Sequence, residues 1–364
     1  MCKKIFIAAT GQHCGKTTVC LSLMHLARRK YGRVGFIKPL GPKCVSFAGR
    51  TMDKDAVLMA RIYGLEQDAH LMSPLVLPSG STKDYLDGRI DHDAQVRRIT
   101  QACEELEKRC DFLIIEGSGH GGVGSVVGLS NARMARLLEA PVVMVTSGGI
   151  GNVIDSVLLN RALYDREGAE VRMLLVNKLL TEKKEGTLSY LRRAFEGSGI
   201  QVKPAFDYSP VLANPTMQNL SGLLGKPLHG DPTGRNRIVH HIQLGAASSQ
   251  KVIDGLQDST LLITTSSRDE LLVTTSSLYH IPSYRTKIAG LVIPGHAPIS
   301  PITQKILDDS NIPYIRIETT TADAFTMVSD HVSKITADDE EKLLHIRTAA
   351  ETQIDFEAVD AIAG

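Results

Sequence analysis

The chain has 364 residues, and its 41 basic and 40 acidic residues give a formal net charge of +1. A balance this close to zero creates no global field toward nucleic acid or an anionic membrane surface, so we expect neither partner. Hydrophobic residues make up 43% and charged residues 22%, a globular composition that argues against wholesale disorder. The longest apolar run, near 141–146, has the length of a strand and not of a membrane span.

The N-terminal sequence, MCKKIFIAATGQHCGKTT, favours a first strand over a signal peptide. Its start is basic, but the apolar stretch is short and breaks into glycine and lysine. We therefore expect the chain to stay in the cytoplasm. The 6 cysteines include no C-x-x-C pair, so free thiols in a reducing compartment fit better than a disulfide framework or a zinc site.

The first half of the chain alternates short apolar runs with helical patterns. Strands are expected at 4–9, 34–38, 111–117, 141–147 and 171–178, and helices at about 16–29, 54–63, 93–109, 130–138 and 152–166. The strands are continuously apolar, as a parallel sheet covered by helices on both faces requires. Strands that alternate with helices predict a doubly wound α/β domain.

The length favours two domains, because a single core rarely grows past roughly 250–300 residues. Prolines gather between about 203 and 235, so we place a boundary near 210. A second series of apolar strands follows: RIVHHIQLGA, STLLITTS, IAGLVIPG and PYIRIETT. The expected division is a nucleotide-binding domain at 1–210, a smaller α/β domain at 211–337, and a charged helix and tail at 338–364.

The strongest functional signal is ATGQHCGKTT, between the first strand and the first helix. Its glycines let the backbone wrap around phosphate oxygens, and the loop amides would point inward at a helix start. Lys16 would reach the β- and γ-phosphates, and the Thr17 hydroxyl would hold Mg²⁺. Thr10 replaces the usual first glycine, and a plain glycine turn before a lysine is the alternative. The expected nucleotide-binding residues are Gly11, Gln12, His13, Cys14, Gly15, Lys16, Thr17 and Thr18.

A second signal is IIEGSGHGGVGSVVGLSNA at 114–132, where Glu116 leaves the carboxyl end of an apolar strand. That end of a doubly wound sheet faces the ligand crevice, which would bring Glu116 to the Mg²⁺ that Thr17 holds. The glycines that follow are costly to order unless something approaches the backbone closely. The alternative is a flexible loop with a solvated glutamate.

Other polar residues follow strands at the same edge. One of Asp53 and Asp55 would complete the metal site, because hard cations prefer oxygen ligands, or would cap a helix. Lys38 ends the second strand, at the crevice or as a strand-end lysine that reaches solvent. Asn177 and Lys178 end the strand 171–178, where asparagine would bond an adenine edge or form a turn.

These residues resemble a known family. The segments ATGQHCGKTT, KP at 38–39, DKDA at 53–56, EGSGHGGVGS at 116–125 and VNK at 176–178 resemble the dethiobiotin synthetase-like ATPase fold. They are still more similar to the amino-terminal region of long bacterial phosphotransacetylases, over about 1–210. The stretch 212–335 resembles the DRTGG domain that accompanies this region, and GDPTGRNR stands near its naming motif.

The resemblance implies ATP and Mg²⁺ as cofactors. Lys16 and Lys38 would be catalytic, stabilising the charge of transferring phosphate and carbamate, while Thr17, Asp55 and Glu116 would hold Mg²⁺. Asn177 would read adenine, with Lys178 beside it in the nucleotide site. The segments PLGPKC and GHGGVGS depart from the synthetase, so we expect ATP binding without its diamine substrate. The chain ends where the phosphotransacetylase catalytic domain would begin, so acetyl transfer is not expected.

Three hypotheses about function follow. The first is an ATP- and Mg²⁺-binding protein that, if an enzyme, phosphorylates a carboxylate or carbamate of an unidentified small molecule. The second is a non-enzymatic metabolic regulator in which bound nucleotide changes how the second domain or a partner enzyme packs. The third and weakest is a partitioning-type ATPase, because Gln12 and His13 stand where such proteins carry a second lysine. By analogy with related sites, we expect a homodimer.

Overall fold

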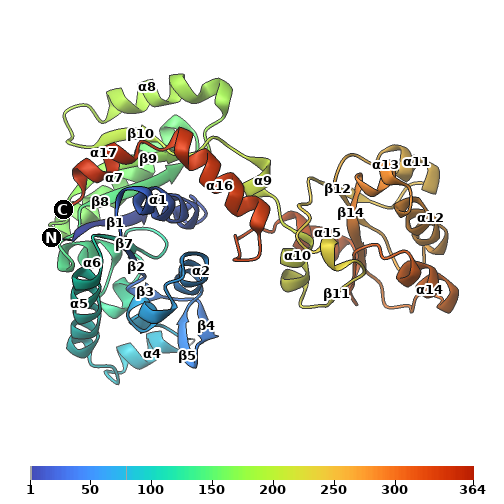
Figure 1. The fold of residues 1–364 in the computed structure, drawn as a ribbon, viewed down its shortest axis with the longest axis horizontal. Coiled ribbons are helices and arrows are strands. Elements are labelled where there is room, and N and C mark those ends of the chain that lie inside the picture. Colours follow the sequence, from blue (N-terminus) through green and yellow to red (C-terminus); the bar gives the residue numbers. More distant parts are fainter. Residues whose placement is uncertain (1, 79) are drawn as a thin grey trace. The chain divides into compact units, whose positions relative to one another are not determined.

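The computed structural model describes residues 2–78 and 80–364, which form two compact units. Unit 1 contains the chain up to Tyr208 and, again, Ile346–Gly364 (Figure 1). Unit 2 contains Ser209–His345. The chain thus returns to unit 1 after unit 2, which differs from the expected separate helix and tail at 338–364.

Unit 1 is built on a parallel sheet with the strand order β10-β9-β8-β1-β7-β2. Its strands are β1 (Lys3–Ala9), β2 (Val34–Ile37), β7 (Phe112–Glu116), β8 (Val142–Ser147), β9 (Val171–Asn177) and β10 (Gln201–Pro204). All neighbouring strands run parallel, which confirms the predicted doubly wound α/β class. No strand was expected at β10, which is short and in which only Val202 is fully buried.

Helices cover both faces of this sheet. The helices of the unit are α1 (Lys16–Lys30), α2 (Lys54–Tyr63), α3 (Ala69–Met72), α4 (Ser81–Leu86), α5 (His92–Arg109), α6 (Asn131–Leu137), α7 (Ile150–Glu167), α8 (Lys184–Ala194), α16 (Glu340–Gln353), which begins in unit 2, and α17 (Phe356–Ile362). Side chains such as Leu113 and Ile115 enter one core with α5, α6, α7 and α8. Phe112 points the other way, toward Tyr31 of the α1 end and Phe356 of α17.

Short elements fill the stretch between β2 and α5, where no strand was expected. Strands β3 (Leu40–Gly41) and β6 (Leu75–Val76) pair in parallel, and β4 (Cys44–Phe47) pairs antiparallel with β5 (Arg50–Asp53). Ala48 and Gly49 turn this hairpin with positive φ angles of 48° and 73°, which match the twist of the two strands. The hairpin delivers Asp53 to the start of α2. Short 3₁₀ turns lie at Glu66–Asp68, Ser125–Val127 and Thr181–Lys183.

Unit 2 is a second α/β sandwich with the strand order β11-β15-β14-β13-β12. Its strands are β11 (Leu228–His229), β12 (His241–Leu244), β13 (Thr260–Ile263), β14 (Ile288–Ile293) and β15 (Tyr314–Arg316), and only β11 pairs antiparallel. Its helices are α9 (Pro210–Ala213), α10 (Met217–Leu224), α11 (Ser249–Asp254), α12 (Asp269–Tyr279), α13 (Pro282–Arg285), α14 (Pro301–Asp309) and α15 (Thr321–Ser329), with a 3₁₀ turn at Pro232–Gly234. Separate apolar clusters fill its two faces, so the predicted second α/β domain is confirmed.

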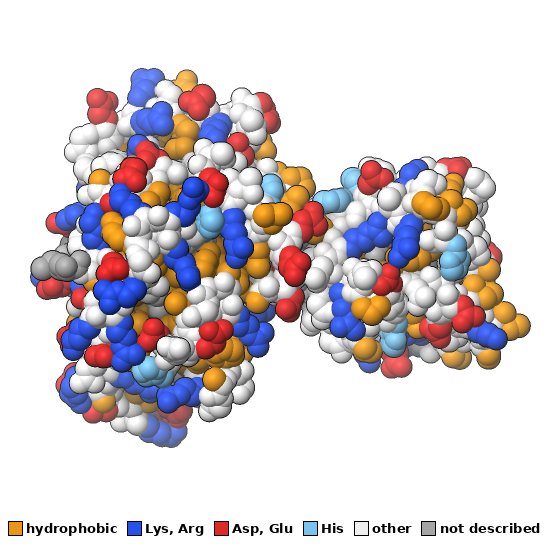
Figure 2. Space-filling view, in the orientation of Figure 1, with side chains coloured by type: hydrophobic (Ala, Val, Ile, Leu, Met, Phe, Trp, Pro, Cys, Tyr) orange, Lys and Arg blue, Asp and Glu red, His pale blue; other side chains and the backbone are white. Residues whose placement is uncertain are grey.

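The surface carries charges of both signs. On the face in Figure 2, Lys and Arg side chains are interspersed with Asp and Glu side chains on each unit, as the near-zero net charge leads one to expect. Within residues 2–78 and 80–364, none of the helices combines the length and the apolar character that crossing a membrane requires.

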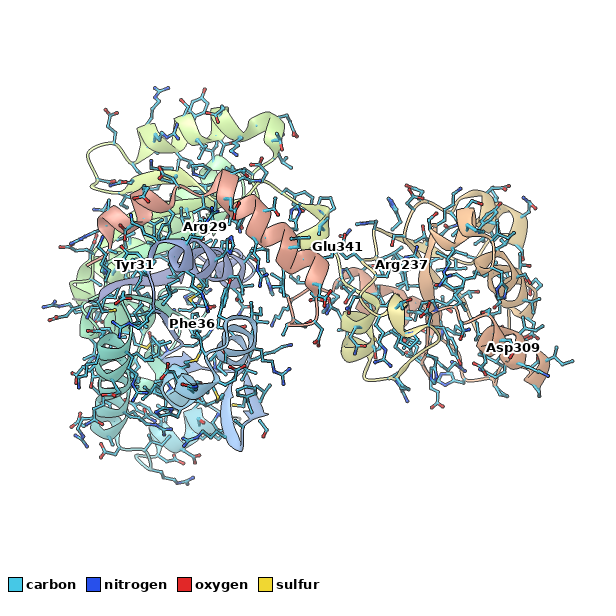
Figure 3. The ribbon with its side chains drawn as sticks, in the orientation of Figure 1. Arg29, Tyr31, Phe36, Arg237, Asp309 and Glu341 are labelled. Carbon is cyan, nitrogen blue, oxygen red and sulfur yellow. The ribbon has the colours of Figure 1, made fainter. Side chains whose placement is uncertain are left out.

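The C-terminal segment completes the edge of unit 1. Lys4 and Gly364 exchange two backbone hydrogen bonds, of 2.8 and 3.2 Å. Asp360 of α17 lies with its Oδ2 atom 3.0 Å from the Nζ atoms of both Lys3 and Lys30, and it accepts a hydrogen bond from Tyr31, labelled in Figure 3. Burial alone would raise the pKa of Asp360, but these donors lower it below its ordinary value.

We expect Asp360→Asn to destabilise unit 1 by about 1.5–3 kcal/mol at neutral pH, because two ammonium groups lose their charged acceptor. The lowered pKa means that folding favours the charged carboxylate. Its contribution is therefore complete above an ordinary Asp pKa of about 3.9 and is lost as pH falls through the folded-state value. Urea unfolding across pH measures this. Asp155→Asn, at an exposed aspartate of α7, is the control, and equal losses from both variants would contradict the assignment.

Candidate functional site

The phosphate loop connects β1 to α1 as predicted. Gly15 is the N-cap of α1 and has a left-handed φ of 92°. Within the described chain no side chain caps this helix start, so its first N–H groups remain available to an anion. Gln12 and His13 are exposed at the loop tip, while Cys14 is buried.

Polar contacts from neighbouring strands hold this loop from behind. The Asn177 amide donates to the Cys14 carbonyl (2.9 Å), and Lys178 donates to the His13 carbonyl (2.8 Å). A Cβ atom on Gly15 would lie 2.2 Å from the Asn177 Nδ2 atom, so only glycine fits there. The Oδ1 atom of Asn177 accepts from the Phe206 N–H (3.1 Å). Both polar atoms of the amide thus have partners within the chain. The adenine contact of Asn177 and the place of Lys178 in the nucleotide site stay predictions.

Thr10, which replaces the first glycine of the usual pattern, fixes the start of the loop. Its hydroxyl lies 3.0 Å from the Thr146 hydroxyl at the end of β8 and 3.6 Å from the Cys14 Sγ atom. The substitution therefore adds contacts to the adjacent strand and leaves the backbone turn intact. At the other end of the loop, the Thr18 carbonyl accepts from Ser22 (2.8 Å) inside α1.

A buried cluster of one lysine and three carboxylates lies beside the loop. The Lys38 Nζ atom is 2.6 Å from Asp55 Oδ2, 3.1 Å from Glu116 Oε1 and 4.0 Å from Asp53 Oδ1. The Thr17 hydroxyl donates to Glu116 Oε1 (3.3 Å). The structure thus brings together the residues predicted for the metal, together with Lys38.

Burial and charge oppose each other within this cluster. Burial raises the pKa of Glu116, while the Lys38 and Lys16 charges act against it, and the net shift is upward. For Lys38, burial lowers the pKa, but Glu116, Asp55 and Asp53 outweigh it and raise the pKa above the ordinary value. Lys38 therefore stays charged and supplies the positive charge that the carboxylates need.

The two aspartates divide the roles that the sequence left open. Asp53 caps α2, because its Oδ1 atom accepts from the Asp55 N–H (2.9 Å) and its Oδ2 atom accepts from the Lys43 N–H (3.1 Å). Burial raises the pKa of Asp53. Asp55 instead directs its carboxylate to the Lys38 ammonium, at the edge of the sheet.

The donor set fits a hard cation. Thr17, Asp55 and Glu116 offer hydroxyl and carboxylate oxygens, the ligands that Mg²⁺ prefers. The Oε2 atom of Glu116 is buried and has no hydrogen-bond partner among the described residues, so it retains coordinating capacity. Within residues 2–78 and 80–364, no group of three or more His, Cys, Asp or Glu side chains is arranged so that it could hold a metal ion by itself. A bound metal would therefore share the Asp55 and Glu116 carboxylates with Lys38.

The glycine-rich loop after β7 lies against the phosphate loop. Lys16 donates to the Gly119 carbonyl (2.8 Å), and burial lowers the pKa of Lys16. The Oδ1 atom of Asn131 accepts a hydrogen bond from the Ser118 N–H (3.0 Å), and its Nδ2 atom donates to the carbonyls of Ser118 and His120. These contacts order a backbone that the glycines would otherwise leave mobile.

Asn160 of α7 connects the phosphate loop to the glycine-rich loop that follows β7. Its Oδ1 atom accepts from the Gly121 N–H (2.7 Å), and its Nδ2 atom donates to the Thr10 carbonyl (3.1 Å). Sequence reasoning missed Asn160 and Asn131. The available signal for Asn160 was an asparagine among apolar helix positions, where this residue type is unfavourable without a specific partner. Asn131 is the first residue of α6, where an asparagine is ordinary.

We expect Asn160→Ala to destabilise unit 1 by about 1–3 kcal/mol, because buried groups of both loops lose their partner. Amide hydrogen exchange should accelerate in 117–124 and 10–15 together. Asn152→Ala, at an exposed asparagine of the same helix, should change neither loop. Faster exchange confined to one loop would show that Asn160 does not connect them.

Comparison with known proteins identifies both units. Residues 3–216, more than half of the chain, match the AAA domain family (AAA_26), and residues 220–331 match the DRTGG domain. A phosphate acetyltransferase of Pseudomonas aeruginosa is 22% identical over 372 residues, covering 97% of this chain and 51% of that protein. The chain thus spans about half the length of this curated relative.

Two further relatives match the first unit. An ATP-dependent dethiobiotin synthetase of Aromatoleum aromaticum is 25% identical over 201 residues, covering 55% of this chain and 89% of that protein. A cobyric acid synthase of Pelotomaculum thermopropionicum is 28% identical over 200 residues, covering 49% and 38%. These matches confirm the resemblance to dethiobiotin synthetases and phosphotransacetylases that the loop and strand-end residues had indicated. The chain belongs to the dethiobiotin synthetase-like AAA domain family, and its P-loop domain is followed by a DRTGG domain.

Proposed function

We propose that unit 1 binds ATP with Mg²⁺ at the phosphate loop. The observation that carries this proposal is the convergence of Lys16, Thr17 and Glu116 beside a glycine-capped helix start. The uncapped N–H groups of α1 and the Lys16 ammonium supply positive charge for phosphate oxygens. The family relative named as an ATP-dependent synthetase supports ATP as the nucleotide.

Each site residue has a role in this proposal. Lys16 leaves the Gly119 carbonyl and neutralises the β- and γ-phosphates, while Thr17, Asp55 and Glu116 hold Mg²⁺. The metal neutralises phosphate charge when bound. Lys38, which keeps its proton inside the carboxylate cluster, stabilises negative charge on an acceptor group.

The proposed reaction is phosphorylation of a carboxylate or carbamate of a small molecule. An anionic acceptor must approach a triphosphate, and their mutual repulsion has to be neutralised before the oxygen atoms meet. The Lys38 ammonium contacts Glu116, and the Lys16 charge also acts on that carboxylate, so both lysines supply cations for this purpose. The acceptor is recognised by its anionic carboxyl oxygens.

We further propose that the protein is a cytoplasmic homodimer.

A second proposal is a nucleotide-sensing regulator without turnover. It is supported by unit 2, which has its own sheet, two apolar cores and a DRTGG match. In this proposal ATP bound to unit 1 alters the packing of unit 2 or of a partner enzyme.

For ATP binding, we expect titration calorimetry with Mg²⁺ to give a dissociation constant that Lys16→Ala raises about 10–100-fold, since a charged contact to phosphate is worth about 1.5–3 kcal/mol. Lys83→Ala, at an exposed lysine of α4, is the matched control and should bind as the unaltered chain does. Equal affinity in the Lys16→Ala variant would refute the site.

For turnover, we expect steady phosphate release from ATP with one member of a panel of carboxylates and of amines supplied with bicarbonate. The Lys16→Ala variant measures contaminating activity. Release that never exceeds this background, combined with nucleotide-dependent hydrogen exchange in unit 2, would instead support the regulator.

A further inference from the structure

Two cysteines that are distant in sequence meet at the end of the unit 1 sheet opposite the phosphate loop. Cys2 precedes β1, and Cys110 lies at the C-cap of α5, just before β7. Because β1 and β7 are parallel neighbours with Lys3 opposite Phe112, the residues that precede them converge. The two Sγ atoms lie 3.4 Å apart.

The fold makes room for this contact. Cys110 is buried, and a Cβ atom on Gly35 of β2 would lie 3.0 Å from its Sγ atom. Cys2 is partly exposed, which gives small molecules a route to its sulfur. The Cys110 thiol also donates to the Leu106 carbonyl (3.0 Å), and the Cys2 thiol to the Lys3 carbonyl (3.3 Å).

The two thiols are chemically unequal. The contact with the Cys110 thiol lowers the pKa of Cys2, and the Lys4 charge acts in the same direction, while burial and the acidic Glu107 and Asp111 oppose them. The same contact and burial raise the pKa of Cys110. Cys2 is therefore the better nucleophile, and Cys110 is the protonated resolving thiol beside it.

The other cysteines lack this combination. Burial raises the pKa of Cys20 and Cys103, which makes them inert, and the Cys103 thiol is directed to Glu107 (3.4 Å). Cys44 is exposed on the β4 strand. A reactive thiol next to a resolving thiol is typical of a redox-sensitive pair.

We propose that Cys2 and Cys110 form a reversible disulfide when the protein meets hydrogen peroxide. The Cys2 thiolate attacks one peroxide oxygen, the O–O bond breaks, and the departing oxygen leaves as water after protonation. The Cys110 sulfur then attacks the sulfur of the Cys2 sulfenic acid, the S–S bond forms and the S–O bond breaks. The second oxygen leaves as water with the Cys110 proton. Two thiols are oxidised, one peroxide is reduced to two waters, and a dithiol reverses the change.

The disulfide would stabilise unit 1 without altering its nucleotide site. It joins residues that are 108 positions apart, and long closed loops restrict the unfolded chain most. The phosphate loop and Glu116 stand at the opposite, carboxyl ends of β1 and β7. We therefore expect a higher melting temperature on oxidation, and an unchanged ATP affinity if the proposed site is correct.

The test uses the full chain with Cys44→Ser, which removes the exposed thiol that would link two molecules. Reduced protein is treated with hydrogen peroxide, remaining thiols are alkylated, and peptides are mapped by mass spectrometry. The expected result is a peptide linking Cys2 to Cys110, with a rise in melting temperature that dithiothreitol reverses. Both should vanish in an added Cys2→Ser variant, whose partly exposed position leaves folding intact, and persist with Cys103→Ser.

Three results would overturn the proposal. They are a Cys2 sulfinic acid without a cross-link, a Cys2–Cys103 link in place of the expected one, and a thermal shift that survives Cys2→Ser. None of these results depends on ATP binding, so the disulfide and the proposed nucleotide site stand or fall separately.

Discussion

The buried ion cluster around Lys38 is the constraint on which the site depends. An unpaired ammonium or carboxylate inside a protein is costly, so the four charges are tolerated only together. Lys38 follows β2 and Glu116 ends β7, and these strands pair in parallel with Ile37 opposite Ile115. The strand order thus places a lysine and a glutamate side by side at the edge where β1 delivers the phosphate loop.

Because the site is built from residues at strand ends, much of it could be predicted from the sequence. A continuously apolar strand is a strong local signal, and a polar residue at its carboxyl end is conspicuous because the preceding residues are buried. Lys38 and Glu116 were located in this way, and the glycine-lysine turn located Lys16 and Thr17. Parallel strands then require these ends to meet, although no sequence pattern states that Lys38 lies between the carboxylates.

Residues that act through long-range contacts escaped prediction. Asn160 bonds Thr10 across 150 positions, and its sequence neighbours reveal nothing of this partner. Asn177 was located correctly at a strand end, yet its amide supports the phosphate loop through the Cys14 carbonyl. Strand β10 was missed because it is an edge strand, with only part of its surface buried.

The contacts of the C-terminal segment, Ile346–Gly364, with unit 1 could not be predicted from the sequence either. A boundary near 210 follows from prolines, but local composition gives no indication that Phe356 packs against Phe112, or that Asp360 pairs with Lys3 and Lys30. A chain cut at this boundary would expose one side of Phe112 and leave Tyr31 without its acceptor. Unit 1 is therefore completed by residues that follow unit 2 in the chain, and helix α16 contains residues of both. A change that melts the part of α16 from Ile346 onward would disturb unit 1 itself, because those residues belong to the unit that carries the phosphate loop.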